Sequence, residues 1–437
     1  MPFTKFNNKT GKLQVSTNHR YLVFSDGTPF FYLGDTAWEL FHRLSLEEAK
    51  QYLLNRVEKG FTVIQAVVLA ELDGLTAANF YGDLPLIDCD LTTPNEAYFR
   101  HVDNIIHFAE EIGLFIGMLP TWGSNWKKEE KNEAVFTKET AQIFGRFLGE
   151  RYRNNAIIWI LGGDRFVEND EEFAIIESMA LGLKEGDAGS HLITFHPRGP
   201  GCSSETLHQA KWLDFNMCQS SHGAHDNDIG IFIENDYNLD PPKPTLDGEP
   251  HYETMPVGFY YKDTSRYDRF DDYDARQAAY WALLSGACGH TYGNNNIWQM
   301  WSTKFEPVLW ANKPWIDSLD TPGAYQMGNI RQLFESFAFQ DFIPAQEMIV
   351  DGCTNGGGKI RASRSSKGAF AFIYSPRGEP FTINKKGFNS KNIKEFWYDP
   401  RYGCKYHFHT TANAAFQTYA PPTSGRGNDW LLILESE

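Results

Sequence analysis

The chain has 437 residues, of which 42% are hydrophobic and 22% charged, so it can bury a large core and exceeds one ordinary domain. Its 40 basic and 56 acidic residues give a formal net charge of −16, which disfavours nucleic acid and anionic membrane surfaces as partners. No run approaches the ~20 apolar residues that span a bilayer, so no membrane insertion is expected.

The chain begins with a predicted hairpin, whose strands cover residues 13–15 and 21–24, and then alternates between strand-like and helix-like stretches. Strands are predicted at residues 30–38, 61–70, 114–120, 155–164, 191–197, 213–220, 243–249 and 290–299. Helices are predicted at residues 45–60, 95–113, 137–153, 171–184, 228–239, 273–286 and 325–337. Eight such strand–helix units in a row favour a closed (β/α)8 TIM barrel over an open doubly wound sheet.

After about residue 341 the helical period disappears. Short alternating stretches follow at residues 359–362, 369–374, 395–398 and 430–434, separated by turn residues. This pattern predicts a C-terminal antiparallel β-sandwich domain at 341–437, behind a barrel and hairpin at 1–340. No low-complexity linker separates the two, so we expect them to pack together. Few exposed aromatic residues are expected in the sandwich, which favours a structural brace over a sugar-binding module.

Functional groups of such barrels lie at the C-terminal ends of the strands. In this chain those positions hold amides, aromatic rings and acids, which are the groups that bind sugar hydroxyls and stack on sugar rings. An aromatic content of 15% agrees with this reading, although core packing also uses these residues. The predicted substrate contacts are Asp35, Trp38, Gln65, Trp122, Asn125, His196, Gln219, His251, Tyr292, Asn294 and Trp298. A helix N-cap is the alternative for Asp35, and a structural hydrogen bond is the alternative for His196.

Two carboxylates lie at the ends of the fourth and seventh predicted strands, Asp164 and Glu249. Glycoside hydrolysis needs such a pair, because one acid protonates the departing oxygen while the other attacks the anomeric carbon or activates water. Asp164 follows an apolar strand and two glycines, so burial would raise its pKa as a general acid requires. An N-cap or an ion pair with Arg165 is its structural alternative. Glu249 is expected to be the ionised nucleophile, with an exposed loop acid as its alternative and Glu253 as a competitor.

Metal and nucleotide chemistry have little support in the sequence. The segment SHGAHD brings together His222, His225 and Asp226, but no third histidine stands at ligand spacing and HExxH is absent. GxGxxG after the first strand and a Walker A sequence are also absent. The six cysteines show no CxxC pairing and are interpreted as free thiols. We therefore predict no metal and no cofactor, and keep a metal-dependent hydrolase and a non-catalytic carbohydrate-binding barrel as alternatives.

Four segments resemble the apiosidase-like glycoside hydrolases (glycoside hydrolase family 140): FSDGTPFFYLGDTAW, IIWILGGD, PTLDGEPHYE and WYDPRYG with DWLLIL. The resemblance extends over essentially the whole chain. It implies a catalytic barrel backed by a β-sandwich, acting on apiose-containing side chains of the pectic polysaccharide rhamnogalacturonan II. It also implies that Asp164 is the acid/base and Glu249 the second carboxylate, an arrangement that favours a retaining enzyme.

Two further expectations accompany the resemblance. Many related barrels carry Asn-Glu at the fourth strand where this chain has Gly163-Asp164, whose shorter side chain could widen the gap between the two carboxyl groups. The substrate, an oligosaccharide or polysaccharide, implies a periplasmic or secreted protein. The polar segment 1–11 has no apolar stretch that would make it a signal peptide.

Overall fold

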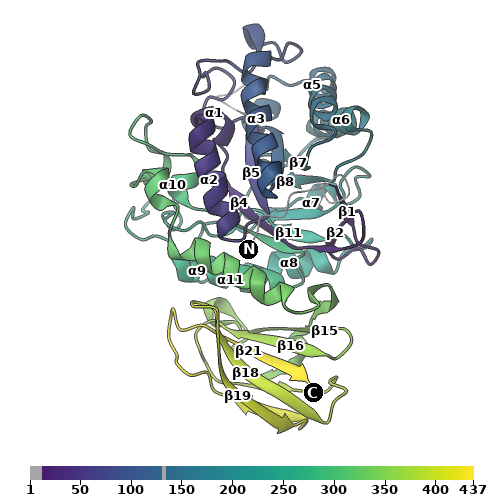
Figure 1. The fold of residues 1–437 in the computed structure, drawn as a ribbon, viewed down its shortest axis with the longest axis vertical. Helices are drawn as coiled ribbons and strands as arrows, with labels where there is room; N and C mark the ends of the chain where they lie inside the picture. The colour runs from purple at the N-terminus through teal and green to yellow at the C-terminus, as the bar shows by residue number, and fades with distance from the viewer. Residues whose placement is uncertain (1–11, 130–133) are drawn as a thin grey trace.

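The computed structural model describes residues 12–129 and 134–437, and the segment 1–11 lies outside the described residues. Figure 1 shows a barrel of strands surrounded by helices and, below it, a smaller part made of strands. Between the two lie α9 (Asp272–Leu284) and α11 (Pro322–Glu335). The described residues contain no helix that combines the length and the apolar character needed to cross a membrane.

Eight parallel strands form the barrel, and their order in the sheet follows their order in the chain. They are β4 (Tyr32–Thr36), β5 (Val63–Leu69), β6 (Phe115–Thr121), β7 (Ile157–Gly162), β8 (Ile193–His196), β10 (Asn216–Gln219), β11 (Thr245–Asp247) and β12 (Gly289–Tyr292). A ninth strand, β9 (Gly201–Cys202), pairs antiparallel with β10. Between β8 and β10, the Asp214 N–H donates to the Ile193 carbonyl at 2.9 Å, and the Thr194 hydroxyl donates to the Phe215 carbonyl at 2.7 Å. The (β/α)8 fold predicted from the sequence is confirmed.

The predicted helices are present with small shifts at their ends. They are α2 (Leu46–Glu58), α3 (Glu96–Ile112), α5 (Lys138–Tyr152), α6 (Asp170–Asp187), α8 (Gly230–Tyr237), α9 and α11. The side chain of Ser45 caps α2 by accepting from the Glu48 N–H, and Glu48 returns a hydrogen bond to the Ser45 N–H. Gly113 ends α3 with φ at 87°, a left-handed conformation that glycine adopts without strain.

Four one-turn helices were not predicted, because four residues are too few to show a helical period. They are α1 (Leu40–Arg43), α4 (Gly123–Trp126), α7 (Ser204–Leu207) and α10 (Asn295–Trp298). Each of α1, α4 and α10 follows a barrel strand at its C-terminal end. These short helices therefore belong to the loops that surround the barrel mouth.

A small antiparallel sheet covers the opposite, N-terminal end of the barrel. The predicted hairpin forms as β1 (Leu13–Val15) and β2 (Leu22–Phe24), and β3 (Pro29–Phe30) adds to it. The predicted first barrel strand is thus two strands, β3 and β4. Phe30 packs edge-on against Phe115, the first residue of β6, with ring centroids 5.3 Å apart. Because this end is filled by apolar rings, the site chemistry is confined to the other end.

The C-terminal part consists of two antiparallel sheets. The larger contains β13 (Phe342–Pro344), β15 (Arg361–Ser365), β16 (Phe370–Ser375), β21 (Trp430–Ser436), β18 (Asn392–Asp399) and β19 (Cys404–Ala412). The smaller contains β14 (Ile349–Asp351), β17 (Phe381–Asn384) and β20 (Phe416–Tyr419). Apolar side chains fill the space between them, as in a β-sandwich.

The second face of the larger sheet packs on the barrel helices α9 and α11, as Figure 1 shows. The rings of Tyr280 and Tyr374 stack here with centroids 4.8 Å apart. Beside them, Arg276 on α9 donates to both carboxylate oxygens of Asp429, at 2.8 and 2.6 Å, and both side chains are buried. The two parts therefore share one continuous apolar interface with a buried ion pair, as the missing linker predicted.

Candidate active site

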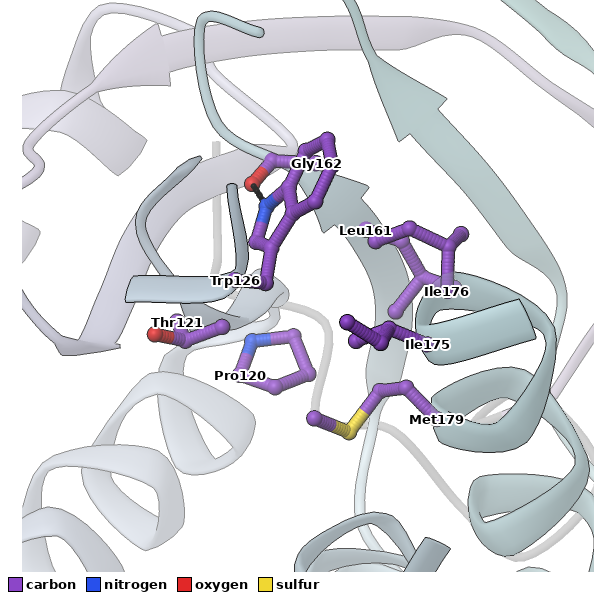
Figure 2. A pocket seen from close by; sticks show the side chains of 8 residues that line it. All are labelled: Pro120, Thr121, Trp126, Leu161, Gly162, Ile175, Ile176 and Met179. Atoms are coloured by element: carbon purple, nitrogen blue, oxygen red, sulfur yellow. Dashed lines mark hydrogen bonds between the residues drawn. The ribbon is translucent and has the colours of Figure 1, made fainter. Parts of the chain in front are cut away.

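The backbone at the end of β7 adopts a left-handed conformation that favours glycine. Gly162, Gly163 and Asp164 all have positive φ, at 93°, 95° and 58°. A Cβ on Gly162 would lie 2.3 Å from the carbonyl oxygen of His196, so no larger residue fits there. The indole N–H of Trp126 donates to the Gly162 carbonyl at 2.7 Å, as Figure 2 shows. These contacts fix the position from which the Asp164 side chain projects.

Below this turn, Trp126, Ile175 and Met179 border a small apolar cavity with a volume of about 10 Å³ (Figure 2). That volume has room for about one water molecule, so the cavity is a packing defect and not a ligand site. It lies between β7 and α6, on the helix side of the strand. The chemistry must therefore lie elsewhere, on the face to which Asp164 points.

Asp164 keeps part of its side chain accessible, with 34% of it exposed. Its Oδ2 accepts a hydrogen bond from Arg165 at 3.2 Å. Burial of the surroundings raises the pKa of Asp164, and the negative charge of Glu249 raises it further, to about 6 despite nearby cations. A carboxyl group with this pKa holds a proton in mildly acidic solution and can donate it.

Glu249 follows β11, and only 10% of its side chain is exposed. Its Oε2 lies 2.9 Å from Nε2 of His196, and its Oε1 lies 3.1 Å from Nε2 of His222. Burial alone would raise the pKa of Glu249, but hydrogen bonds from His196 and His222 outweigh it and lower the pKa to about 2. Between pH values of about 2 and about 6, Glu249 is thus ionised while Asp164 is protonated.

The ring of His196 joins these two carboxylate residues. Its Nδ1 accepts from the backbone N–H of Asp164 at 3.2 Å, and this nitrogen therefore carries no proton. The ring N–H is then on Nε2, the atom that faces Glu249. One backbone donor just after β7 thereby sets the tautomer that faces the carboxylate after β11.

Tryptophan rings form an apolar wall next to this centre. The rings of Trp38 and Trp122 are 5.4 Å apart, and each lies beside His196, at 5.4 and 6.1 Å. Trp298 belongs to the same buried apolar cluster. Apolar rings near a carboxyl group exclude water from it, which agrees with the raised pKa of Asp164.

Two side chains of this centre were not among the predicted site residues. His222 was interpreted as part of the loop structure or as a substrate contact, and the structure pairs it with Glu249. Glu71 follows β5, and its pKa is raised well above the ordinary value by burial and by the charges of Asp164, Glu39 and Glu249. Glu71 could have been found from the sequence, because it stands directly after an apolar strand, as Asp164 does.

Two of the predicted contacts have side chains that point out of the barrel, toward the helix layer. Asp35 is fully buried between β4 and α2, where it accepts from Tyr52 at 2.6 Å and from Arg56 at 2.5 Å. Tyr292 donates to Glu253 at 2.5 Å, toward α11. Successive strand side chains face opposite sides, so a shift of one residue moves a group from the mouth to the helix layer.

Three more predicted contacts are fully or almost fully buried and serve the structure. Gln65 lies inside the barrel, where it donates to the Gly248 carbonyl at 3.0 Å. Asn294 caps α10 by accepting from the Asn296 N–H at 2.9 Å. The ring of His251 stacks on Phe270 at 4.5 Å, and burial lowers the pKa of His251 to about 3.

The remaining two predicted contacts lie in loops at the mouth. Asn125 on α4 donates to the Thr121 hydroxyl at 3.0 Å, and its carbonyl accepts from the N–H groups of Val135 and Phe136. Gln219 ends β10 and packs against Gly199. Both shape the loops beside the carboxylate pair.

The residues of the SHGAHD segment point in three directions instead of toward one ion. His222 contacts Glu249, His225 lies 3.0 Å from both Asp274 and Asp268, and Asp226 pairs with Arg377 at 2.8 Å. Within residues 12–129 and 134–437, no group of three or more His, Cys, Asp and Glu side chains is arranged to hold a metal ion.

The loop that carries His222 is fastened to the sandwich. Beyond the pair of Asp226 with Arg377, Asp228 binds Lys359 at 2.7 Å and Arg361 at 2.5 Å. A Cβ on Gly357 of the sandwich would collide with the Asp226 carboxylate, so the two segments are in direct contact. The loop that positions His222, the partner of Glu249, is thus held in place partly by the C-terminal domain.

A parallel eight-stranded barrel with paired carboxylates after its fourth and seventh strands defines the class of glycoside hydrolases, and solved structures agree. One of them, titled "Glycoside hydrolase", is 31% identical, with a TM-score of 0.89 and 99% coverage of both chains. A glycoside hydrolase family 5 structure from Bacteroides vulgatus is 29% identical, with a TM-score of 0.89, and covers 99% of this chain and 95% of that one. The protein is a glycoside hydrolase.

The chain belongs to the apiosidase-like family, because the family model of the apiosidase-like catalytic domain matches residues 16–341. A second family model, described as "Putative collagen-binding domain of a collagenase", matches residues 343–435. No curated protein matches the chain.

Proposed function

We propose that this enzyme releases apiose-containing side chains from rhamnogalacturonan II, with Asp164 as general acid and base and Glu249 as nucleophile. The single observation that carries the assignment is the split in pKa of the two carboxylates, to about 6 and about 2, around one histidine ring. When the surroundings give two carboxyl groups very different pKa values, the group with the higher pKa can donate a proton while the other stays charged. The substrate is inferred from the family to which the chain belongs.

The proposed reaction has two steps. In the first, a Glu249 oxygen bonds to the anomeric carbon while Asp164 gives its proton to the glycosidic oxygen, whose bond to that carbon breaks. In the second, water attacks the same carbon, gives a proton to Asp164 and breaks the ester bond to Glu249. The two displacements restore both side chains and retain the configuration of the sugar.

Supporting side chains have distinct parts in this scheme. His196 and His222 stabilise Glu249 in its charged form, since each offers a ring nitrogen to a different carboxylate oxygen. Charge-assisted hydrogen bonds of this kind are stronger than neutral ones. The Trp38 and Trp122 rings are buried beside His196 and hold its imidazole in position. Because the substrate is an extracellular polysaccharide, the proposed location is the periplasm or the exterior of the cell.

The test is to incubate the protein with rhamnogalacturonan II oligosaccharides and identify the released sugar by mass spectrometry and chromatography. Release of apiose, or of a side chain with apiose at its reducing end, is the expected result. A Glu249→Gln protein serves as the control, since it keeps the fold and lacks the nucleophile. Turnover that releases only other sugars would contradict the substrate assignment while leaving the hydrolase class intact.

A further inference from the structure

A second cleft lies on the same end of the barrel as the carboxylate pair. Its volume is about 400 Å³, within the roughly 300–1,000 Å³ of typical small-molecule sites. The lining comes from the loops that follow β4, β5 and β12, which are the first, second and eighth barrel strands. We refer to it as the side cleft.

The side cleft carries the groups that bind sugars. Phe80 and Phe305 contribute aromatic surface, and 47% of Phe80 is exposed. Lys304 places its ammonium group 5.3 Å from the centre of the Phe80 ring, where it can donate to a hydroxyl. Aromatic faces beside polar donors match the apolar C–H face and the hydroxyl rim of a pyranose.

One buried amide of the cleft wall lacks a partner. Oδ1 of Asn79 accepts from the N–H groups of Tyr81 and Asp83, at 2.9 and 3.0 Å, which fixes the orientation of the amide. Its Nδ2 then has no hydrogen-bond partner within the residues that the structure describes, although only 5% of Asn79 is exposed. Buried donors without partners are rare, and a hydroxyl oxygen in the cleft is an acceptor that would satisfy this one.

The side cleft is joined to the carboxylate pair by a short piece of chain. Leu72 lines the cleft, and its N–H donates to Glu39 at 3.0 Å. The preceding residue, Glu71, is close enough to Asp164 and Glu249 for their charges to raise its pKa. A chain of sugars that places one glycosidic bond at Asp164 would extend along this segment into the cleft.

We propose that the side cleft binds a pyranose residue of the substrate chain, away from the bond that is cut. The proposal rests on the function proposed above and extends it to an oligosaccharide that occupies both places. It assigns recognition of the chain to Phe80, Asn79 and Lys304, and cleavage to the carboxylate pair. Small substrates that reach only the carboxylates make no use of the cleft.

The experiment compares two substrates, a rhamnogalacturonan II oligosaccharide and a nitrophenyl apioside. With Phe80→Ala, KM for the oligosaccharide should rise about 5- to 10-fold with kcat unchanged, as expected for the loss of one aromatic contact. Both constants for the nitrophenyl apioside should stay the same. The matched control is Phe416→Ala, an exposed ring in the sandwich that should change neither substrate. An unchanged KM for the oligosaccharide, or equal changes for both substrates, would overturn the proposal.

A binding measurement separates this proposal from the function on which it rests. Calorimetry of the Glu249→Gln protein with the same oligosaccharides reports affinity without turnover. Weaker binding when Phe80→Ala is added supports the side cleft even where the wild-type enzyme releases no apiose. Equal affinity with and without the Phe80 ring would overturn the cleft assignment even where apiose is released.

Discussion

Asp164 and Glu249 contact opposite nitrogens of a single imidazole ring, that of His196. The Asp164 N–H donates to Nδ1 at 3.2 Å, and Glu249 Oε2 lies 2.9 Å from Nε2. Backbone geometry at the end of β7 therefore orients an imidazole that pairs with the carboxylate following β11. Hydrogen bonds from His196 and His222 lower the pKa of Glu249, whereas burial and the charge of Glu249 raise the pKa of Asp164, so the two acids hold different protonation states between the two values.

The first prediction concerns proton donation by Asp164. An Asp164→Asn protein lacks the acid, so kcat on a natural oligosaccharide should fall by about 10²–10⁴. The loss should be much smaller for the first step on a nitrophenyl apioside, whose leaving group departs without protonation. Steady-state and burst kinetics on both substrates measure the difference. An equal loss on both would contradict the role of proton donor.

The second prediction concerns pH. Asp164 must be protonated to act as acid, and its pKa is raised to about 6, so kcat/KM should fall as the pH rises through about 6. Glu249 must be ionised, and its pKa is lowered to about 2, so no second decline is expected between pH 4 and 6. A profile of kcat/KM from pH 4 to 9 tests both. An optimum above pH 8 would contradict the assignment.

The third prediction concerns His222. A His222→Phe protein keeps the ring but loses the donor 3.1 Å from Glu249, so the pKa of Glu249 should rise. With one charge-assisted hydrogen bond removed, kcat/KM should fall about 10- to 100-fold, and the acid side of the pH profile should move to higher pH. The matched control is His251→Phe, which replaces a buried stacked ring outside this network. A fall of equal size in the control would show that the loss is merely structural.

The fourth prediction concerns the ion pairs between the sandwich and the segment that follows His222. Arg361 is buried and binds Asp228 at 2.5 Å and Glu234 at 2.6 Å. Arg361→Ala removes one partner from two carboxylates that are 20% and 30% exposed and keep Lys359, so the free energy of unfolding should fall by about 1–3 kcal/mol. Chemical denaturation measures this loss. Arg146→Ala is the control, because its pair with Glu185 is 43% and 49% exposed and should be worth under ~1 kcal/mol. Equal effects of the two changes would contradict the bracing role.

Most of the fold could be predicted because its signals are local. The capping box at Ser45 and Glu48 and the glycine at position 113 mark helix ends directly in the sequence. The apolar run of β5 identifies a strand covered on both faces. The short strands β13, β14 and β20 were missed because three or four residues are too few to show an alternating pattern. One-turn helices were missed for the equivalent reason.

The site was harder to predict because it depends on orientation. Chain position correctly located Asp164 and Glu249 at strand ends, but it could not tell which neighbours face inward. Asp35 and Tyr292 lie at the C-terminal ends of barrel strands, as predicted, but their side chains point to the helix layer. His222 reaches Glu249 only because the barrel brings two loops together. Contacts across loops of this kind leave no periodic signal in the sequence.

The most direct test of the central claim is covalent trapping of the nucleophile. A 2-deoxy-2-fluoro apioside with a good leaving group slows the second step more than the first, so the glycosyl-enzyme ester accumulates. Peptide mass spectrometry should then find the fluorosugar on a peptide that contains Glu249, and Glu249→Gln should abolish the label. An adduct on Glu71 or Glu253, or a first-formed product of inverted configuration with no adduct, would contradict the account.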